Sequence, residues 1–123
     1  VWILPSIAQW EKSCGKHPTQ KPLCLLARII QASTQKGDWI LDPFAGSSTT
    51  GIAANLLGRR YLGIDQNDSY LQISKARKEE IADVAKQSEY IEKLHKQAKL
   101  FGDIKYSNTL SDIEPLYNIE LPF

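Results

Sequence analysis

The most informative segment of this chain is the run Trp39-Ile40-Leu41-Asp42-Pro43-Phe44-Ala45-Gly46-Ser47-Ser48-Thr49-Thr50-Gly51. A short apolar run ends at an acidic residue, and a loop of small residues then leads into a helical segment over residues 52–57. This order predicts a strand, a ligand-binding loop and a helix, because ligands bind outside the carboxyl ends of the strands of an open α/β sheet. Small residues let a ligand approach the backbone, and the first turn of a helix offers free N–H groups.

Helical and strand-like segments alternate on both sides of this stretch. Pro22 suits the first position of a helix, and apolar residues at helical spacing from Leu23 onward predict that this helix ends near residues 32–35. A second strand is predicted over residues 60–64, and Asn67 or Asp68 is expected to cap the helix that follows it. The alternation predicts a parallel sheet, and the unbroken apolar run at residues 39–41 is typical of a parallel strand covered on both faces.

The C-terminal part of the chain has a different pattern. Residues 75–99 are rich in charged side chains and carry one apolar stripe at helical spacing, formed by Ile81, Val84, Ile91, Leu94 and Ala98. We expect one solvated helix that packs on the domain through this stripe and ends near Gly102; the alternative is a helix that binds a partner. The expected division is therefore a ligand-binding part at 1–77, a charged helix at 78–102 and an irregular tail at 103–123.

Composition narrows the class of protein. The 123 residues carry 15 basic and 14 acidic side chains, so the charge of the whole chain favours neither a nucleic-acid-binding nor a membrane protein. Cys14 and Cys24 have no Cys or His cluster around them, so no metal site is predicted. No apolar run approaches the ~20 residues that cross a bilayer. The chain has no methionine and begins in an apolar stretch, which suggests a piece of a longer protein.

The loop distinguishes between classes of cofactor. Asp65 ends the second predicted strand, and an acidic residue about 20 positions beyond such a loop commonly accepts hydrogen bonds from ribose hydroxyls. The loop lacks the middle glycine of the dinucleotide motif, and Ile52 stands where a phosphate-binding P-loop has lysine. Asp42 repels phosphate and can pair with an ammonium group. These residues favour S-adenosylmethionine (SAM), which has an ammonium group and no phosphate, over a dinucleotide.

Two further motifs carry a resemblance to an enzyme family. His17-Pro18-Thr19-Gln20-Lys21-Pro22 precedes the loop, and Gly58-Arg59-Arg60-Tyr61-Leu62-Gly63-Ile64-Asp65 follows it. In this order the motifs resemble those of bacterial SAM-dependent DNA amino-methyltransferases of the beta class, which methylate the exocyclic amine of adenine or cytosine. The resemblance covers Trp2 to about Arg77. It implies an α/β, Rossmann-like methyltransferase fold that is partial here, with parallel strands, flanking helices and a C-terminal helical extension.

The resemblance also implies a cofactor site. Lys21 is the candidate partner of the SAM carboxylate, Asp65 is expected to hold the ribose, and Gln66 to lie near the adenine ring. The loop is expected to receive the cofactor, with the threonines at the helix start near its methionine end. The implied cofactor-binding residues are Thr19, Gln20, Lys21, Asp42, Phe44, Ala45, Gly46, Ser47, Thr49, Thr50, Asp65 and Gln66.

Two departures from the family pattern affect the functional interpretation. Ser48 stands where the family usually has glycine, and a serine penalises positive φ and adds a side chain near the ligand, so we expect weaker SAM binding. The catalytic tetrapeptide of the family, Asp/Asn/Ser-Pro-Pro-Tyr/Phe, is absent from the sequence. The nearest string, at residues 114–117, lacks the second proline and follows the cofactor motifs. No residue is therefore assigned a catalytic role, and the motif is expected upstream, in a missing N-terminal part or a partner chain.

The resulting hypothesis is the SAM-binding portion of a site-specific DNA methyltransferase of a restriction-modification system. The complete protein would act on double-stranded DNA in the bacterial cytoplasm, on adenine N6 rather than cytosine N4. The alternative is a non-catalytic SAM-binding subunit or a degenerate remnant of a methyltransferase. Among single residues, His17 is expected to have a structural hydrogen-bonding role, Trp39 to lie in the core, and Arg59 and Arg60 to be ordinary surface residues.

Overall fold

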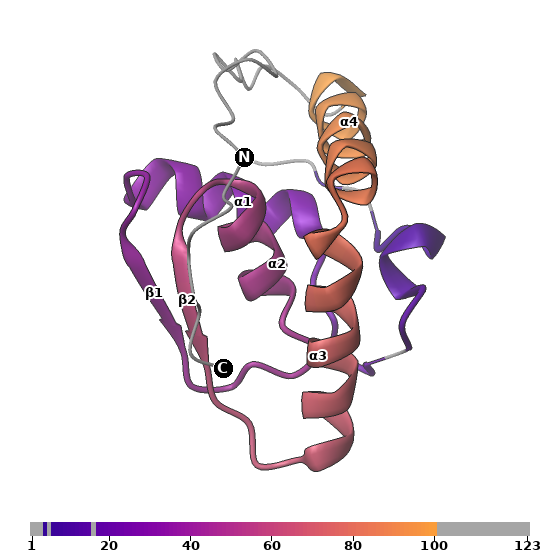
Figure 1. The fold of residues 1–123 in the computed structure, drawn as a ribbon. Coiled ribbons are helices and arrows are strands. Elements are labelled where there is room, and N and C mark those ends of the chain that lie inside the picture. Colours follow the sequence, from indigo (N-terminus) through magenta and orange to yellow (C-terminus); the bar gives the residue numbers. More distant parts are fainter. Residues whose placement is uncertain (1–3, 5, 16, 101–123) are drawn as a thin grey trace.

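A computed structural model of the chain describes Leu4, residues 6–15 and residues 17–100. Two parallel strands, β1 (Trp39–Asp42) and β2 (Arg60–Gly63), pair so that Trp39 lies opposite Arg60 and Asp42 opposite Gly63. Figure 1 shows helix α2 (Thr49–Leu56), which connects the strands, lying between them and α3 (Asp68–Ala82). The predicted alternation of strands and helices is confirmed. The expectations for Gly102 and for residues 103–123 lie outside the described residues.

Helix α1 (Leu23–Ser33) begins one residue later than predicted, because Pro22 is its extended N-cap, and it packs against α2. Its first N–H group is satisfied from a distant segment, since Leu23 N donates to Glu11 Oε2 at 2.8 Å. Glu11 belongs to a 3-10 helix, η1 (Gln9–Lys12), in a segment where no regular structure is expected from the sequence. The fully buried Glu11 carboxylate also accepts from Ala8 N, the residue before η1. One side chain therefore satisfies N–H groups at the start of both η1 and α1. This role arises from a contact between segments, which local sequence pattern does not encode.

Among the described residues, the core lies on one face of the sheet. Tyr61 of β2 is 0% exposed and packs with the apolar side chains of α1 and α2. On the opposite face, Trp39 is 53% and Leu41 61% exposed, and Leu62 and Ile64 are exposed beside them. The expectations that β1 is covered on both faces and that Trp39 lies in the core are therefore wrong for this chain. Successive side chains of a strand point to opposite faces, and the described helices pack on one of them.

The charged region forms two helices rather than one. Helix α3 runs to Ala82, and α4 (Val84–Leu100) begins after Asp83, whose backbone is extended at φ −74° and ψ 121°. Asp83 Oδ1 accepts from Ala85 N at 2.8 Å, so this residue caps α4 and ends α3. Ile81, Ile91 and Leu94 are buried as the stripe predicts, whereas Val84 is exposed at the break. Asn67 caps α3 as expected, accepting from Ser69 N at 2.9 Å.

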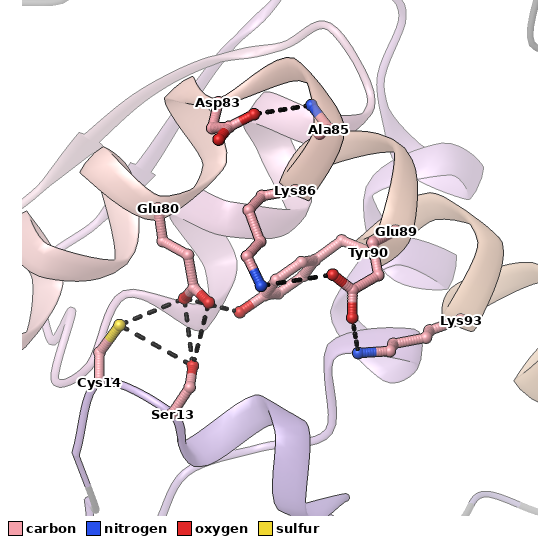
Figure 2. A network of polar contacts seen from close by, with 9 residues as sticks. All are labelled: Ser13, Cys14, Glu80, Asp83, Ala85, Lys86, Glu89, Tyr90 and Lys93. Carbon is pink, nitrogen blue, oxygen red and sulfur yellow. Dashed lines mark hydrogen bonds and ion pairs between the residues drawn. The ribbon is translucent and has the colours of Figure 1, made fainter.

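A polar network joins α3 and α4 to the segment after η1. Figure 2 shows the Glu80 carboxylate facing Ser13, Cys14 and Tyr90. Tyr90 Oη donates to Glu80 Oε2 at 2.9 Å, and Cys14 Sγ donates to the same oxygen at 3.2 Å. Burial, assisted by the Glu80 carboxylate, raises the pKa of the Cys14 thiol, so this cysteine stays a neutral donor. The network holds the segment that precedes the His17 motif against the end of α3.

Candidate cofactor site

The two motifs that suggest a cofactor site meet at Gly46 and His17. Gly46 has a φ of +53°, and a Cβ atom at this position would lie 2.9 Å from His17 Nε2. The His17 ring also packs on Tyr70 of α3, with 4.2 Å between ring centroids, and its Nδ1 accepts from Thr19 N. The structural role expected for His17 is confirmed. The glycine is required here both by its backbone conformation and by the close approach of the imidazole.

Asp42 ends β1 and is held by the loop that follows it. Its Oδ1 accepts from Phe44 N at 3.1 Å, and its Oδ2 accepts from the hydroxyl of Thr50 at 2.7 Å. Thr50 lies in the first turn of α2, so the carboxylate is fixed between the start of the loop and the start of the helix. The hydroxyl of Thr50 therefore orients Asp42, whatever it contacts on a ligand.

Asp65 follows β2 and is bonded to the same loop. Its Oδ2 accepts from Gly46 N at 2.8 Å, and its Oδ1 accepts from Asn67 N at 2.8 Å. These backbone donors, with Asn67 first, lower the pKa of the Asp65 carboxyl from its ordinary value. Each oxygen keeps a second lone pair, which can accept from a hydroxyl of a ligand. The two carboxylates thus lie at the same edge of the sheet and fix the loop from both strands.

The lowered pKa of Asp65 makes a prediction about pH. A carboxyl whose pKa is lowered on folding stabilises the folded state fully above its unfolded pKa of about 4, and this stability is lost as the pH falls through the lower folded value. The difference in urea midpoint between wild type and Asp65→Asn should therefore be constant from pH 7 to about 5 and shrink below about 4. A difference that persists unchanged at the acid end would contradict this account.

The floor of the loop is built from hydroxyl groups. Ser48 has a φ of 54° and a ψ of 39°, the left-handed conformation that serine penalises. Its Oγ donates to Ser74 Oγ at 2.9 Å, and Ser74 Oγ in turn donates to Gly46 O at 3.0 Å. Tyr61 Oη lies 3.5 Å from Ser48 Oγ, at the limit of hydrogen bonding. The Ser48 side chain is therefore buried under the loop and bonded to α3, although it makes no capping bond to α2.

The effect of Ser48 on stability can be separated into two parts. Ser48→Gly removes a left-handed penalty of about 1 kcal/mol and also removes hydrogen bonds of similar net value, so its unfolding free energy should stay close to wild type. Ser48→Ala loses the bonds and keeps the penalty, so it should be destabilised by about 1–2 kcal/mol. Urea unfolding of both variants tests this, and an alanine variant as stable as the glycine variant would contradict it. The weaker SAM binding expected for Ser48 stays a prediction.

The other candidate residues differ in their exposure. Phe44 is 88% exposed at the loop, and Thr19, Lys21 and Gln66 are also exposed. Ala45, Gly46, Ser47 and Thr49 are buried. Gln20 is turned into the interior, where its amide donates to Glu11 O at 2.9 Å, and its Oε1 has no partner among the described residues. Within the described ranges, no group of three or more His, Cys, Asp or Glu residues is placed to hold a metal ion, and no helix is long and apolar enough to cross a membrane.

Two arginines have roles that the sequence pattern does not indicate. Arg77 of α3 is 2% exposed, and its Nη1 donates to Ser47 and Thr49 of the loop. Arg59 is also buried and donates to Thr34 O at 2.7 Å and to Leu57 O at 2.6 Å, so the expectation that it is a surface residue is wrong. Arginine is mostly exposed in proteins, so helical spacing gives no signal for a buried one. Only the packing of carbonyl and hydroxyl oxygens around each guanidinium reveals these roles.

Several known methyltransferases are similar in sequence to this chain. M2.MboI of Moraxella bovis, a Type II methyltransferase, is 58% identical over 97 residues, which are 79% of this chain and 35% of that protein. M2.DpnII of Streptococcus pneumoniae, also a Type II methyltransferase, is 57% identical over 79 residues, which are 64% of this chain and 30% of that protein. The DNA adenine methyltransferase YhdJ of Escherichia coli (strain K12) is 38% identical over 115 residues, which are 94% of this chain and 38% of that protein.

The fold agrees with a solved structure of the same kind. The M1.HpyAVI–SAM complex superposes with a TM-score of 0.50 at 48% identity, covering 50% of this chain and 32% of that one. The chain spans about a third of the length of the relatives that it matches. The DNA methylase family, of the N6/N4 type, matches residues 1–76, which is well over half of the sequence. The expected Rossmann-like α/β methyltransferase fold is confirmed, and this chain belongs to the DNA methylase family.

Proposed function

We propose that this chain is the SAM-binding part of a DNA methyltransferase that acts on the N6 amine of adenine. The observation that supports it most is the pair of carboxylates, Asp42 and Asp65, that end adjacent parallel strands and both bind the loop between them. An acidic pair suits a cofactor with an ammonium group and a ribose, and no phosphate. Adenine is preferred over cytosine N4 because YhdJ is named a DNA adenine methyltransferase.

The residues around the loop fit the chemistry of SAM. Asp42 would pair with its ammonium group, the first turn of α2 and Lys21 would face its carboxylate, and Asp65 would accept from its ribose. Phe44, which is 88% exposed, and Gln66 would lie along the adenine ring. When bound, SAM supplies an electrophilic methyl group on its sulfonium. The remaining candidates, Thr19, Ala45, Gly46, Ser47, Thr49 and Thr50, would shape the walls of this site, and Gln20, whose side chain is turned into the interior, would support the segment behind it.

The acceptor half of the reaction is proposed to lie in another part of a longer protein or in a partner chain. The exposed face of the sheet, with Trp39, Leu41, Leu62 and Ile64, supports this, since parallel sheets are ordinarily covered on both faces. The missing part would supply the catalytic tetrapeptide and the contacts to double-stranded DNA, in a restriction-modification system of the bacterial cytoplasm. This chain would contribute the orientation of the methyl donor, which positions it for direct transfer.

Titration calorimetry with SAM tests the proposed site. The wild-type chain is expected to bind SAM and not NAD, and Asp65→Asn should bind SAM at least about tenfold more weakly, since it loses a charge-assisted acceptor. Asp38→Asn is the matched control, because Asp38 also accepts from a backbone N–H, that of Gln35, but lies at the turn before β1. Binding of NAD without SAM would overturn the proposal.

A methylation assay tests where the acceptor half lies. The chain alone is expected to bind SAM without transferring methyl groups to adenine-containing duplex DNA. A longer protein that contains this chain and an upstream Pro-Pro-aromatic motif should transfer them. Turnover by the chain alone would contradict the placement of catalysis elsewhere. Failure of the longer protein to turn over, with SAM binding intact, would favour a non-catalytic SAM-binding subunit.

A further inference from the structure

Arg77 of α3 reaches the underside of the cofactor loop. A single atom, Nη1, donates to Ser47 O at 2.8 Å, to Ser47 Oγ at 3.2 Å and to Thr49 Oγ1 at 2.9 Å. These acceptors belong to the residues on either side of Ser48, the described non-glycine residue with a positive φ. The guanidinium therefore holds the loop on both sides of its strained residue.

Packing alone does not account for this arginine. The Arg77 side chain is 2% exposed, and its Nε and Nη2 have no hydrogen-bond partner among the described residues. Nor do the described residues form an ion pair with it within 4.0 Å. Burial lowers the pKa of Arg77, against the charges of Glu11 and Glu80, which raise it. A buried charge without a close counter-ion is costly, and an apolar side chain of similar volume would fill the space at less cost.

The strain at Ser48 explains what the arginine does. A residue stays in a sparsely populated conformation when the contacts around it stabilise that conformation by more than its conformational penalty. Ser48 is bonded through its side chain to Ser74, which lies one turn before Arg77 on the same face of α3. Hydrogen bonds from a charged donor are stronger than neutral ones and exceed the left-handed penalty of serine. Ser74 and Arg77 together therefore outweigh the tendency of Ser48 to return to negative φ.

We infer that Arg77 is a positioning residue for SAM binding: it holds Ser48 in the left-handed conformation and so keeps the loop in the shape that receives the cofactor. This rests on the proposed function of the loop. It predicts that a glycine at position 48, which adopts this conformation without penalty, makes the loop less dependent on Arg77. A merely structural arginine would show no such dependence.

Calorimetric titration of the full chain with SAM, in a double-mutant cycle, tests the inference. Arg77→Lys keeps the charge but is shorter, so it should bind SAM roughly tenfold more weakly than wild type. Adding Ser48→Gly to Arg77→Lys should restore the affinity to within about threefold of Ser48→Gly alone. Arg59→Lys is the matched control, because Arg59 is also buried and bonded to carbonyl groups but lies away from the loop, and it should bind like wild type.

The contrary outcomes are distinct from a failure of the proposed function. Wild-type affinity in Arg77→Lys, or an equally weak double variant, would overturn the role of Arg77. If the wild-type chain binds no SAM, the proposed function fails, and NMR of the unliganded chain decides separately whether Arg77 holds Ser48 in the left-handed conformation. The strong intraresidue HN–Hα contact that marks a positive φ should be present for Ser48 in wild type and Arg59→Lys and be weakened in Arg77→Lys. Its persistence in Arg77→Lys would overturn the inference.

Discussion

Gly46→Ala is expected to lower the unfolding free energy by about 2–4 kcal/mol and to abolish measurable SAM binding. Gly46 has a φ of +53°, and the added Cβ would lie 2.9 Å from His17 Nε2 and 3.3 Å from two carbon atoms of the same ring. The imidazole cannot move freely, because it packs on Tyr70. The substitution therefore separates the two motifs that form the site, in addition to straining the backbone.

Gly37→Ala is the matched control for this prediction. Gly37 also has a positive φ, of +87°, but no atom lies within 4 Å of the Cβ that alanine would add. It should cost only the backbone penalty of about 1 kcal/mol and leave SAM affinity unchanged. Urea unfolding and calorimetry of both variants measure the difference. Equal losses of stability in the two variants would show that the approach of His17 to Gly46 has no energetic consequence.

Tyr61→Ala is expected to destabilise the chain by about 3–5 kcal/mol, the range of large-to-small substitutions of buried aromatic residues. Tyr61 is 0% exposed, and its ring packs directly against Gly51 of α2: a Cβ atom added to Gly51 would lie 2.5 Å from the ring. The ring therefore fills the space between β2 and α2. Removal of the ring leaves a cavity beneath the start of α2, which carries the loop. A loss of this size is a large part of the stability of a small domain.

Two variants separate the causes of this effect. Tyr61→Phe keeps the ring and loses only the hydroxyl near Ser48 Oγ, so it should cost about 1 kcal/mol or less. Trp39→Ala removes a larger aromatic side chain from the exposed face of β1, and it should also cost about 1 kcal/mol or less. Chemical unfolding of the three variants checks the order. A Trp39 variant as unstable as Tyr61→Ala would mean that the exposed face of the sheet is covered within this chain.

The parts of the fold that local pattern predicts are those set by local physics. The helix after Pro22, the cap at Asn67 and the two strands follow from apolar spacing and capping chemistry within a few residues. The break at Asp83 was not predicted, although aspartate is a good capping residue, because the apolar stripe continues across it. A stripe indicates which face is buried, and the choice between a helix interior and a cap at Asp83 depends on how α4 packs against α1.

The candidate site shows the same division. The sequence identifies the loop and its two carboxylates because the groups expected to contact the ligand stand in a recognisable order: an acidic residue, small residues and the start of a helix. It does not identify Glu11, Ser74 or Arg77, since buried polar residues look like surface residues in a linear pattern. These three residues act through segments distant in sequence: Glu11 on α1, and Ser74 and Arg77 on the loop.

The sequence by itself determined the family of this protein, the parallel α/β order and the loop that would bind SAM, because these depend on residue types in consecutive positions. The tertiary structure decided which face of the sheet is buried, where the charged region bends, and how Ser48 is held. The physical reason is that hydrogen bonds to buried carbonyl and hydroxyl groups form only when distant segments pack together. Ser74 and Arg77 can bond to Ser48 and Ser47 only because α3 packs beneath the loop.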